Sequence, residues 1–509
     1  MLAFWKTLNA QQRGLIWMGV AAHFLLALIL QLSPDEAHYA LYANHPAWSY
    51  FDHPPLVGWL QIPAVWLGGH DLALRVVPMM CWLLSIVGMA KLAHELTGNM
   101  SMVTMVILLL MLSPLHHLLG IALVPDTLLL ALTVAAMFLV WRLRVPSAAH
   151  KLRLWLLLGI CMGLTGLAKY TGIFLALSTL AYLVLTYRLK LLSFPGFWLA
   201  MLLALVMITP VLYWNAQHDW ISFAYQLDHA DGKGHWLLRR SVLYVLAQVL
   251  SYGALLAAGW YFALRAKPSP ARTISIVFGL PPLLLFIYMA GNGRALPHWT
   301  APAWLAMLPM AALGVQRLVN QFDTRWFKGL RALQVLILAA VAGLLISGGP
   351  AAESGSQIRA MPGQRGMAPS NPIADLYGWR DAAERAKELA AQHGAQHLAV
   401  TNWSLASRIS WYARPMSVWV LDDHRDQFNI WFGRPMQGAS AIVVDWSLMT
   451  FAQPVAPDKF AGCERLEQQA TQHLGRQLAH FNFMLCKDWQ GSPSTGLAFL
   501  SSSVVQPKK

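Results

Sequence analysis

Charged residues are scarce in this chain of 509 residues. Asp, Glu, Lys and Arg make up only 12% of it, 57% is hydrophobic, and the mean hydropathy is +0.47. A soluble domain carries about 25% charged residues, so this composition excludes a soluble enzyme with a single anchor. It predicts an integral membrane protein with many spans. The 23 tryptophans fit that class, because tryptophan collects at membrane–water interfaces.

The sequence also lacks the glycine motifs that bind nucleotides. It contains no Walker motif, no dinucleotide-binding fingerprint and no internal repeat, which disfavours a nucleotide-driven transporter. The net charge of +14 would suit a nucleic-acid binder, but its distribution does not. Residues 1–350 hold 22 Lys and Arg against 10 Asp and Glu, whereas residues 351–509 hold 15 against 13. The excess lies in short clusters between apolar runs, as the positive-inside rule produces, and no nucleic-acid partner is predicted.

Cysteine is rare, with four residues, and no C-x-x-C or other metal-ligand spacing occurs. Cys81 and Cys161 lie in apolar runs and are predicted to be inert packing residues. Cys463 and Cys486 lie in the polar C-terminal part. In an oxidising compartment these two are expected to form a disulfide that closes a loop of roughly 24 residues. The alternative is a pair of buried free thiols.

Apolar runs divide the first 350 residues. The first, Leu15 to Leu32, follows Lys6 and Arg13 and lacks a signal-peptide cleavage site, so we interpret it as a span with a cytoplasmic N-terminus. Further runs centre near Ile86, Leu109, Leu132, Gly159, Leu177, Leu205, Leu250, Leu283, Ala306 and Ala340. At roughly 20 residues each they predict about eleven spans. This topology puts 16 of the 22 basic residues inside, eight of the ten acidic residues outside, and everything after Gly349 outside.

The C-terminal part differs in character. Residues 348–372 are rich in Gly, Pro and Ser and predict a linker. Asp381 to His393 predicts an exposed amphipathic helix. Short β-prone runs follow at residues 398–403, 417–421 and 441–446. The predicted architecture is a polytopic α-helical membrane domain over residues 1–349, with its first outer loop at about 33–70, and a soluble α/β domain over residues 350–509.

Polar side chains gather between Ser33 and Leu60, just after the first span. This stretch holds three carboxylates, Asp35, Glu36 and Asp52, together with histidines and aromatic residues. Such groups at a membrane surface must be solvated, paired or used, so we expect the active site here. The alternative for Asp35 and Glu36 is an N-cap pair for a following helix. Asp126 lies at the outer end of another hairpin, where it could face Asp35 and share acid/base work.

The segment Tyr50-Phe51-Asp52-His53-Pro54-Pro55 offers donors for a phosphate. Tyr50 and His53 can donate hydrogen bonds, and a protonated His53 can offset negative charge; the alternative is a rigid interfacial turn. Lys169 lies between two apolar runs, where a lysine either snorkels or meets an anion, and we favour the anion. Arg294 and His298 are a second pair of candidates. Arg240, beside Arg239, more often borders a span.

These residues carry a resemblance to the GT-C glycosyltransferases. The chain resembles the protein-mannosyltransferase-like family 39 group and the lipid A aminoarabinose transferases, whose pattern is D-E-x-R-Y-A and then Y-F-E-K-P-P. Here the sequence has Asp35-Glu36-Ala37-His38-Tyr39-Ala40 and then Tyr50 to Pro55. Bacterial family members also have counterparts of Pro125-Asp126, of Gly166 to Tyr170 and of Pro297-His298-Trp299. The resemblance covers most of residues 1–350 and continues more loosely beyond.

The resemblance implies an inverting transfer of a sugar from polyprenyl (undecaprenyl) phosphate to an acceptor at the periplasmic face of a bacterial inner membrane. It implies Asp35 as base, Asp126 as helper and Glu36 as a further catalytic candidate. The implied donor-phosphate and substrate-binding residues are Tyr39, Tyr50, Asp52, His53, Lys169, Arg240, Arg294 and His298. No cofactor is certain, and a divalent metal is possible at Asp35 and Asp126.

His38 stands where the aminoarabinose pattern has arginine, and His53 where it has lysine. The expected acceptor is lipid A, another lipopolysaccharide part or an envelope glycan. The alternatives are a protein acceptor, or a transporter or flippase of lipid-linked substrates. A phosphate and Asp52 beside His53 are expected to raise its pKa above the usual value of about 6.5.

Overall fold

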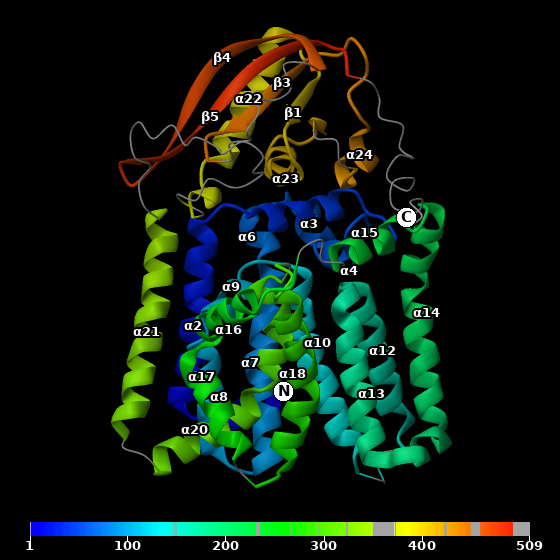
Figure 1. The fold of residues 1–509 in the computed structure, drawn as a ribbon, viewed down its shortest axis with the longest axis vertical. Helices are drawn as coiled ribbons and strands as arrows, with labels where there is room; N and C mark the ends of the chain where they lie inside the picture. Colours follow the sequence, from blue (N-terminus) through cyan, green and yellow to red (C-terminus); the bar gives the residue numbers. More distant parts are fainter. Residues whose placement is uncertain are drawn as a thin grey trace. The chain divides into compact units, whose positions relative to one another are not determined.

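A computed structural model of the chain describes residues 2–145, 147, 150–230, 235–265, 267–293, 295–321, 324–349, 371, 373–421, 425–448 and 459–491. The chain forms two compact units, residues 1–28 with 42–342 and residues 29–41 with 343–509 (Figure 1). We call them the membrane unit and the C-terminal unit. The start of the predicted first outer loop therefore packs with the C-terminal unit, which the sequence did not indicate. The predicted linker lies almost wholly outside the described residues.

The membrane unit is helical throughout its described residues. Its helices are α1 (Leu2–Thr7), α2 (Ala10–Ile29), α4 (Leu56–Trp59), α5 (Ile62–Trp66), α6 (Asp71–Leu74), α7 (Val76–Thr97), α8 (Met100–Met111), α9 (Pro114–Leu119), α10 (Pro125–Leu143), α12 (Leu152–Ala168), η1 (Tyr170–Gly172), α13 (Ile173–Tyr187), η2 (Arg188–Ser193), α14 (Pro195–Gln217), α15 (Ile221–Ala230), α16 (Leu238–Tyr252), α17 (Ala254–Leu264), α18 (Pro270–Ala290), η3 (Pro297–Thr300), α19 (Ala301–Ala306), α20 (Leu308–Gln321) and α21 (Thr324–Ser347). Helix α3 (Pro34–Asn44) begins in the C-terminal unit and ends in this one.

Every predicted apolar run centres on one of these helices. Among the described residues, seven helices are long and apolar enough to cross a membrane, or up to nine if each of two bent pairs is one span. By length and composition alone, this number is lower than the predicted count of about eleven. The runs near Leu109 and Gly159 form helices of 12 and 17 residues, shorter than the roughly 20 residues that a bilayer requires. Gly253, at a φ of 118°, stands between α16 and α17, which meet at 108°.

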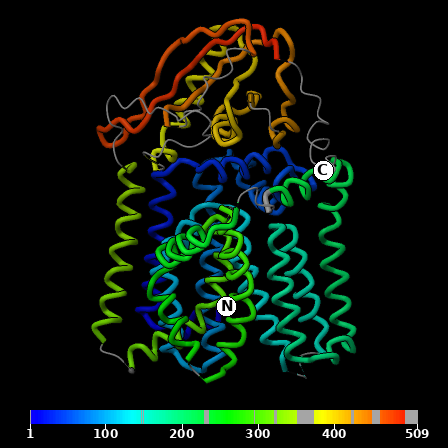
Figure 2. Tube along the Cα trace, in the orientation of Figure 1, coloured from blue at the N-terminus to red at the C-terminus, as the bar shows by residue number. Residues whose placement is uncertain are grey.

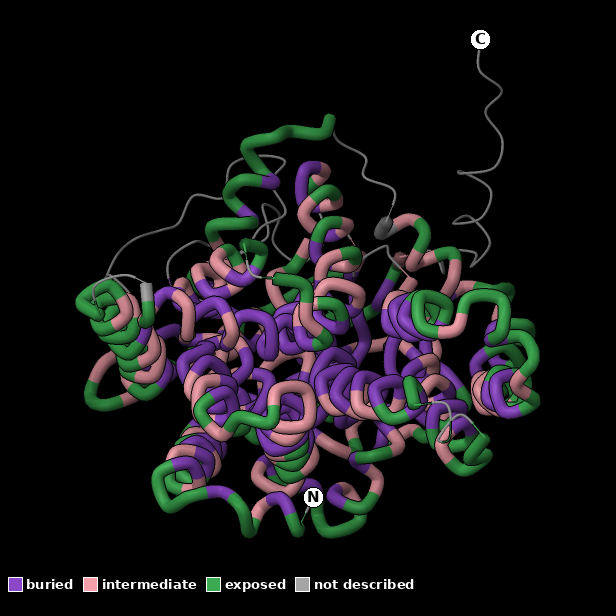
Figure 3. The backbone as a smooth tube through the Cα atoms, turned by 90° about the horizontal axis from the view of Figure 1, so that it is seen from below, coloured by how far each residue is buried: buried purple, intermediate pink, exposed green. Residues whose placement is uncertain are grey.

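Apolar side chains cover the outside of the membrane unit. In Figure 3 buried residues gather on the inner faces of the helices, and exposed residues lie on outward faces. The apolar windows of α14 and α21 both have a mean hydropathy of 2.1, yet only 22% and 11% of their residues are buried. Water would strongly disfavour so much exposed apolar surface. The chain is therefore a multi-pass membrane protein.

Helices α17 and α20 approach each other closely through glycine. A Cβ built on Gly314 would lie 1.6 Å from the carbonyl oxygen of Gly259, and one built on Gly259 would lie 2.4 Å from that of Ala311. Small residues at such crossings let helix backbones make van der Waals contact, which drives helix association in lipid. The same helices run side by side in the trace of Figure 2.

We expect Gly314→Ala to destabilise the protein by about 1–3 kcal/mol, because the added methyl group must push the two helix backbones apart. Gly329→Ala on α21 is the matched control, since nothing lies within 4 Å of a Cβ there. It should leave stability unchanged or raise it slightly through helix propensity. Thermal unfolding of the purified variants in detergent measures both. Equal melting temperatures for the two variants would refute the close packing.

The C-terminal unit contains one five-stranded sheet. Its strands are β1 (His397–Val400), β2 (Val418–Val420), β3 (Ala441–Trp446), β4 (Phe460–His473) and β5 (Arg476–Trp489), in the order β2-β1-β3-β5-β4. Strand β1 pairs in parallel with β2 and β3, and β5 pairs antiparallel with β3 and β4. The helical elements are η4 (Ala374–Leu376), α22 (Trp379–His393), α23 (Trp403–Tyr412) and α24 (Gln427–Phe432).

This unit confirms the predicted α/β fold. The expected amphipathic helix is α22, and the three β-prone runs are β1, β2 and β3. The long β4–β5 hairpin was not predicted, because β4 is rich in Glu and Gln and mostly exposed, a composition that is depleted in strands. The disulfide between Cys463 and Cys486 is confirmed, and these residues are direct partners across the hairpin. Cys81 and Cys161 are buried and free, as predicted.

Candidate active site

The membrane unit contains a buried ion pair between Asp126 and Lys169. Asp126 lies in the first turn of α10, and Lys169 directly follows α12 in an extended conformation. The Lys169 Nζ donates to both carboxylate oxygens of Asp126, at 2.8 and 2.7 Å. Both side chains are almost fully buried. The anion that Lys169 meets in this structure is Asp126, and its predicted contact with the donor phosphate stays a prediction.

The segment around η3 completes this group. The Nε2 of His298 lies 3.7 Å from a carboxylate oxygen of Asp126, and the Lys169 Nζ lies 5.6 Å from the Trp299 ring centre. Sequence reasoning selected His298 but missed what holds it. Gln248 of α16 donates to the Pro297 carbonyl and accepts from the Trp304 Nε1 at 2.8 Å. In the sequence, a glutamine within an apolar run was the signal for these buried hydrogen bonds.

The segment Tyr50 to Pro55 forms a rigid turn. The Tyr50 hydroxyl is buried and donates to the Tyr42 carbonyl at 2.7 Å, and the two rings stack at 3.5 Å. The Tyr42 hydroxyl donates to the Asp52 carboxylate. From α15, Gln226 donates to the Asp52 carbonyl at 2.7 Å. Because the Tyr50 hydroxyl already binds backbone within its own segment, its observed part is to hold the turn.

The charges of the Asp126–Lys169 ion pair act on His53. Burial lowers its pKa; the positive charge of Lys169 adds to that shift, while Asp52 and Asp126 oppose it. Without a bound phosphate, desolvation therefore outweighs the carboxylates, and the raised pKa expected beside a phosphate stays a prediction. The Nδ1 of His53 donates to the Asp52 carbonyl, so in the neutral ring Nε2 is an acceptor.

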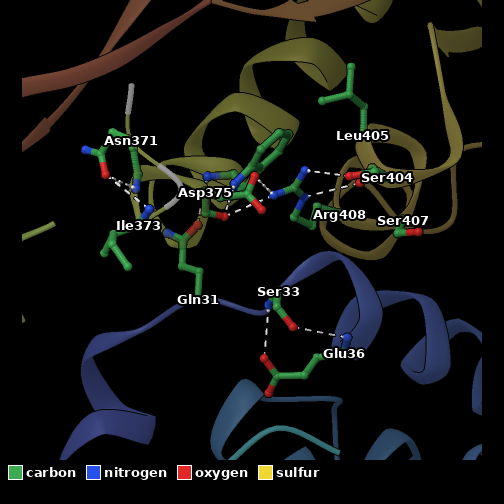
Figure 4. A network of polar contacts seen from close by, with 12 residues as sticks. Gln31, Ser33, Glu36, Asn371, Ile373, Asp375, Ser404, Leu405, Ser407 and Arg408 are labelled. Atoms are coloured by element: carbon green, nitrogen blue, oxygen red, sulfur yellow. Dashed lines mark hydrogen bonds and ion pairs between the residues drawn. The ribbon is translucent and has the colours of Figure 1, made fainter. Parts of the chain in front are cut away.

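The first acidic pair lies in the C-terminal unit, in the first turn of α3. Glu36 and Ser33 form a capping box: the Ser33 N–H donates to the Glu36 carboxylate at 3.0 Å, and the Glu36 N–H donates to the Ser33 Oγ at 3.3 Å (Figure 4). The N-cap alternative thus holds for Glu36. Asp35 is half-buried, and its charge acts on the buried guanidinium of Arg408. Tyr39 is buried.

Asp35 and Asp126 belong to different units, and the expectation that they face each other stays a prediction, as does a metal shared between them. Within the described residues, no three His, Cys, Asp or Glu side chains gather closely enough to hold a metal ion. Arg240 is exposed at the start of α16, where it donates to the His235 carbonyl at 3.3 Å. Arg294 lies outside the described residues.

An apolar pocket of about 250 Å³ adjoins Lys169. Helices α12, α13 and α14 line it with small or aliphatic side chains, among them Gly166, Ala176, Ala204 and Ile208. The sequence signal was a set of glycines and alanines beside a lone lysine, which we did not interpret as a pocket. A buried cation at the edge of an apolar pocket suits an amphiphile with an anionic head.

The family model and the curated relative that match this chain are both named as glycosyltransferases. Residues 52–214 match the model of the dolichyl-phosphate-mannose-protein mannosyltransferase family, a segment that contains Asp52, His53, Asp126 and Lys169. The lipid A galacturonosyltransferase RgtD of Rhizobium johnstonii is 23% identical over 326 residues, which cover 61% of this chain and 64% of RgtD. The chain thus spans somewhat less than two thirds of that relative.

Two solved structures share the fold over nearly the whole chain. They are crystal structures of ArnT from Cupriavidus metallidurans, in the apo state and bound to undecaprenyl phosphate, each with a TM-score of 0.60. Their identities are 15% and 14%, and each comparison covers 92% of this chain and 97% of ArnT. The GT-C fold, a helical membrane part followed by a domain with a sheet, is therefore confirmed, and it agrees with the motif resemblance from the sequence.

Proposed function

We propose that this GT-C protein transfers a sugar from a polyprenyl phosphate to an envelope lipid of the lipid A type, with inversion at the anomeric carbon. The observation that carries the proposal is the buried Asp126–Lys169 pair beside an apolar pocket. Two similarities support it: to RgtD, which is a lipid A galacturonosyltransferase, and to ArnT, which has been solved with bound undecaprenyl phosphate. The site is expected to face the periplasm from the inner membrane.

We expect the pocket residues to hold the donor. An apolar chain fits the groove between α12, α13 and α14, which leaves its phosphate near Lys169. Two of the three ammonium donors of Lys169 bind Asp126, and the third can donate to a phosphate oxygen. His298, beside the same carboxylate, can add a further N–H. Donors fixed before the reaction stabilise the leaving phosphate without reorganisation.

Transfer to a hydroxyl requires one proton acceptor. The acceptor oxygen bonds to the anomeric carbon while the bond from that carbon to the phosphate oxygen breaks, and the polyprenyl phosphate leaves with the electron pair. A hydroxyl acceptor gives its proton to a carboxylate, for which we propose Asp35. A phosphate acceptor is already ionised and needs no base, so Asp35 would then orient it.

Reconstitution tests this function directly. The purified protein in liposomes is supplied with lipid A and a set of undecaprenyl-phosphate sugars, including galacturonic acid, aminoarabinose and neutral hexoses. The proposal expects one donor to yield a glycosylated lipid and free undecaprenyl phosphate. Movement of the donor between leaflets without any product would instead support a flippase.

Donor binding should depend on pH through His53. Because burial lowers the pKa of free His53 below its usual value of about 6.5, the free protein carries it neutral at pH 7. A bound phosphate favours the charged ring and raises the pKa in the complex. Between these two pKa values donor binding takes up a proton, so affinity should fall as pH rises through that window.

Titration calorimetry in buffers of different ionisation enthalpy measures this proton uptake. We expect uptake in the wild type and none in His53→Gln, whose donor affinity should also lose its pH dependence. Asn44→Asp, an exposed change near the same turn, is the control for general charge effects and should keep the uptake. Wild-type affinity that stays constant from about pH 5.5 to 8 would remove His53 from the phosphate site.

A further inference from the structure

The segment that carries Asp35 is held by hydrogen bonds within the C-terminal unit. The Gln31 N–H donates to the Leu376 carbonyl at 3.1 Å, and the Gln31 Oε1 accepts from the Trp379 N–H at 2.7 Å. The Leu32 N–H donates to the Tyr412 hydroxyl at 3.0 Å. These contacts fix both residues that precede the capping box, and therefore the direction in which α3 begins.

Helix α23 contacts the same segment with two of its side chains. Besides Tyr412, the second is Ser407. The Ser407 Oγ donates to the Trp403 carbonyl at 2.7 Å and lies 3.3 Å from the His38 Nδ1, so the histidine is the donor in the second contact. Arg408 comes next on the helix, and Figure 4 shows it above the start of α3.

Arg408 is an unusual residue for a domain core. Its side chain is fully buried, bonded to the carboxylate and carbonyl of Asp375 and packed 3.5 Å from the Trp379 ring centre. Burial lowers the pKa of its guanidinium, and the charges of Asp375, Tyr412 and Asp35 oppose that shift. A buried cation is costly unless anions surround it. One of the anions that act on Arg408 is the proposed catalytic carboxylate.

We propose that α23 is a positioning helix for the acidic pair, with Tyr412 fixing the backbone before Asp35 and Arg408 holding η4, whose Leu376 carbonyl binds Gln31. Helix α23 then has a part in catalysis without contacting the reacting atoms. This inference rests on the proposed role of Asp35. It predicts that changes on α23 lower turnover while donor binding, which depends on the membrane unit, is kept.

Tyr412→Phe tests the backbone contact with little risk to folding. It should lower kcat about tenfold through misplacement of Asp35, leave the KM for the donor within about twofold, and speed amide hydrogen exchange in residues 29–41. Tyr377→Phe is the matched control, because it removes a buried hydroxyl that bonds the Leu345 carbonyl in the same unit. Equal kinetics and equal exchange for the two variants would overturn the proposal.

Arg408→Gln tests the link through η4. Arg408 bonds to the carboxylate and carbonyl of Asp375, and the next residue of η4, Leu376, accepts from the Gln31 N–H. Arg408→Gln should therefore speed amide hydrogen exchange in residues 29–41 and lower kcat, while the KM for the donor is kept. A loss of rate without faster exchange in these residues would make Arg408 merely structural.

The outcomes separate this inference from the proposed function. If Asp35→Asn keeps turnover, the role of Asp35 fails, whatever the α23 variants do. If Asp35→Asn is inactive while Tyr412→Phe matches Tyr377→Phe and Arg408→Gln keeps wild-type exchange in residues 29–41, the function stands and the positioning helix falls. Should Arg408→Gln not fold, the exchange and kinetics of Tyr412→Phe decide alone.

Discussion

Asp35→Asn should lower sugar transfer by about 10²- to 10⁴-fold, the range that a positioned acid or base contributes, while donor binding stays within about threefold of wild type. The amide keeps the shape of the carboxylate but cannot accept the acceptor's proton. Asp35 is half-buried in the first turn of α3 and lies in the field of Arg408, so asparagine is accommodated there without a new clash.

Glu36→Gln is the matched control for this result. Glutamine can take the place of glutamate in a capping box, so the contacts with Ser33 persist and transfer should be retained. Steady-state transfer assays and donor-binding titrations on both purified variants give the comparison. Near wild-type turnover in Asp35→Asn with loss in Glu36→Gln would exchange the roles of the two carboxylates.

Lys169→Gln should abolish detectable donor binding and also destabilise the protein by about 3–5 kcal/mol, the usual cost of leaving one member of a buried ion pair uncompensated. Both effects follow from one contact: the ammonium neutralises buried Asp126 at 2.7 Å and borders the apolar pocket. His298, at 3.7 Å from the same carboxylate, can offset only part of the loss.

The double variant Asp126→Asn with Lys169→Gln separates stability from function. Two neutral amides can pair in the same space, so thermal stability should return to near the wild-type value. Donor binding should stay lost, because no cation remains beside the pocket. Unfolding curves and donor titrations on the single and double variants measure this. Recovery of both stability and binding in the double variant would make the pair purely structural.

Much of the fold was predictable because its signals are local. Each apolar run became a helix, and the three short β-prone runs became β1, β2 and β3. The number of spans could not be predicted in the same way. Gly253 breaks one apolar run into two helices at a sharp angle, and α8 is short. The β4–β5 hairpin was missed because pairing with β5, and not intrinsic preference, keeps its polar residues extended.

The candidate site was predictable as a set of residue types but not as a set of contacts. A lone lysine in an apolar setting indicated an anion, yet its partner lies 43 positions away at the start of another helix. Tyr50 and Glu36 were selected as functional from their chemistry, while their observed contacts are those of a turn and a cap. The hydrogen bonds between residues 29–41 and α23 could be found only in the tertiary structure, because no periodicity in either segment indicates them.

The most direct test of the central claim is mass spectrometry of envelope lipids and glycans from cells that lack the gene, from cells complemented with it, and from cells complemented with Asp35→Asn. The account predicts one sugar-sized mass increment on a lipid, foremost on lipid A, that is present only with the wild-type gene, together with accumulation of the polyprenyl-phosphate sugar in the other two strains. Identical lipids and glycans in all three strains would contradict it.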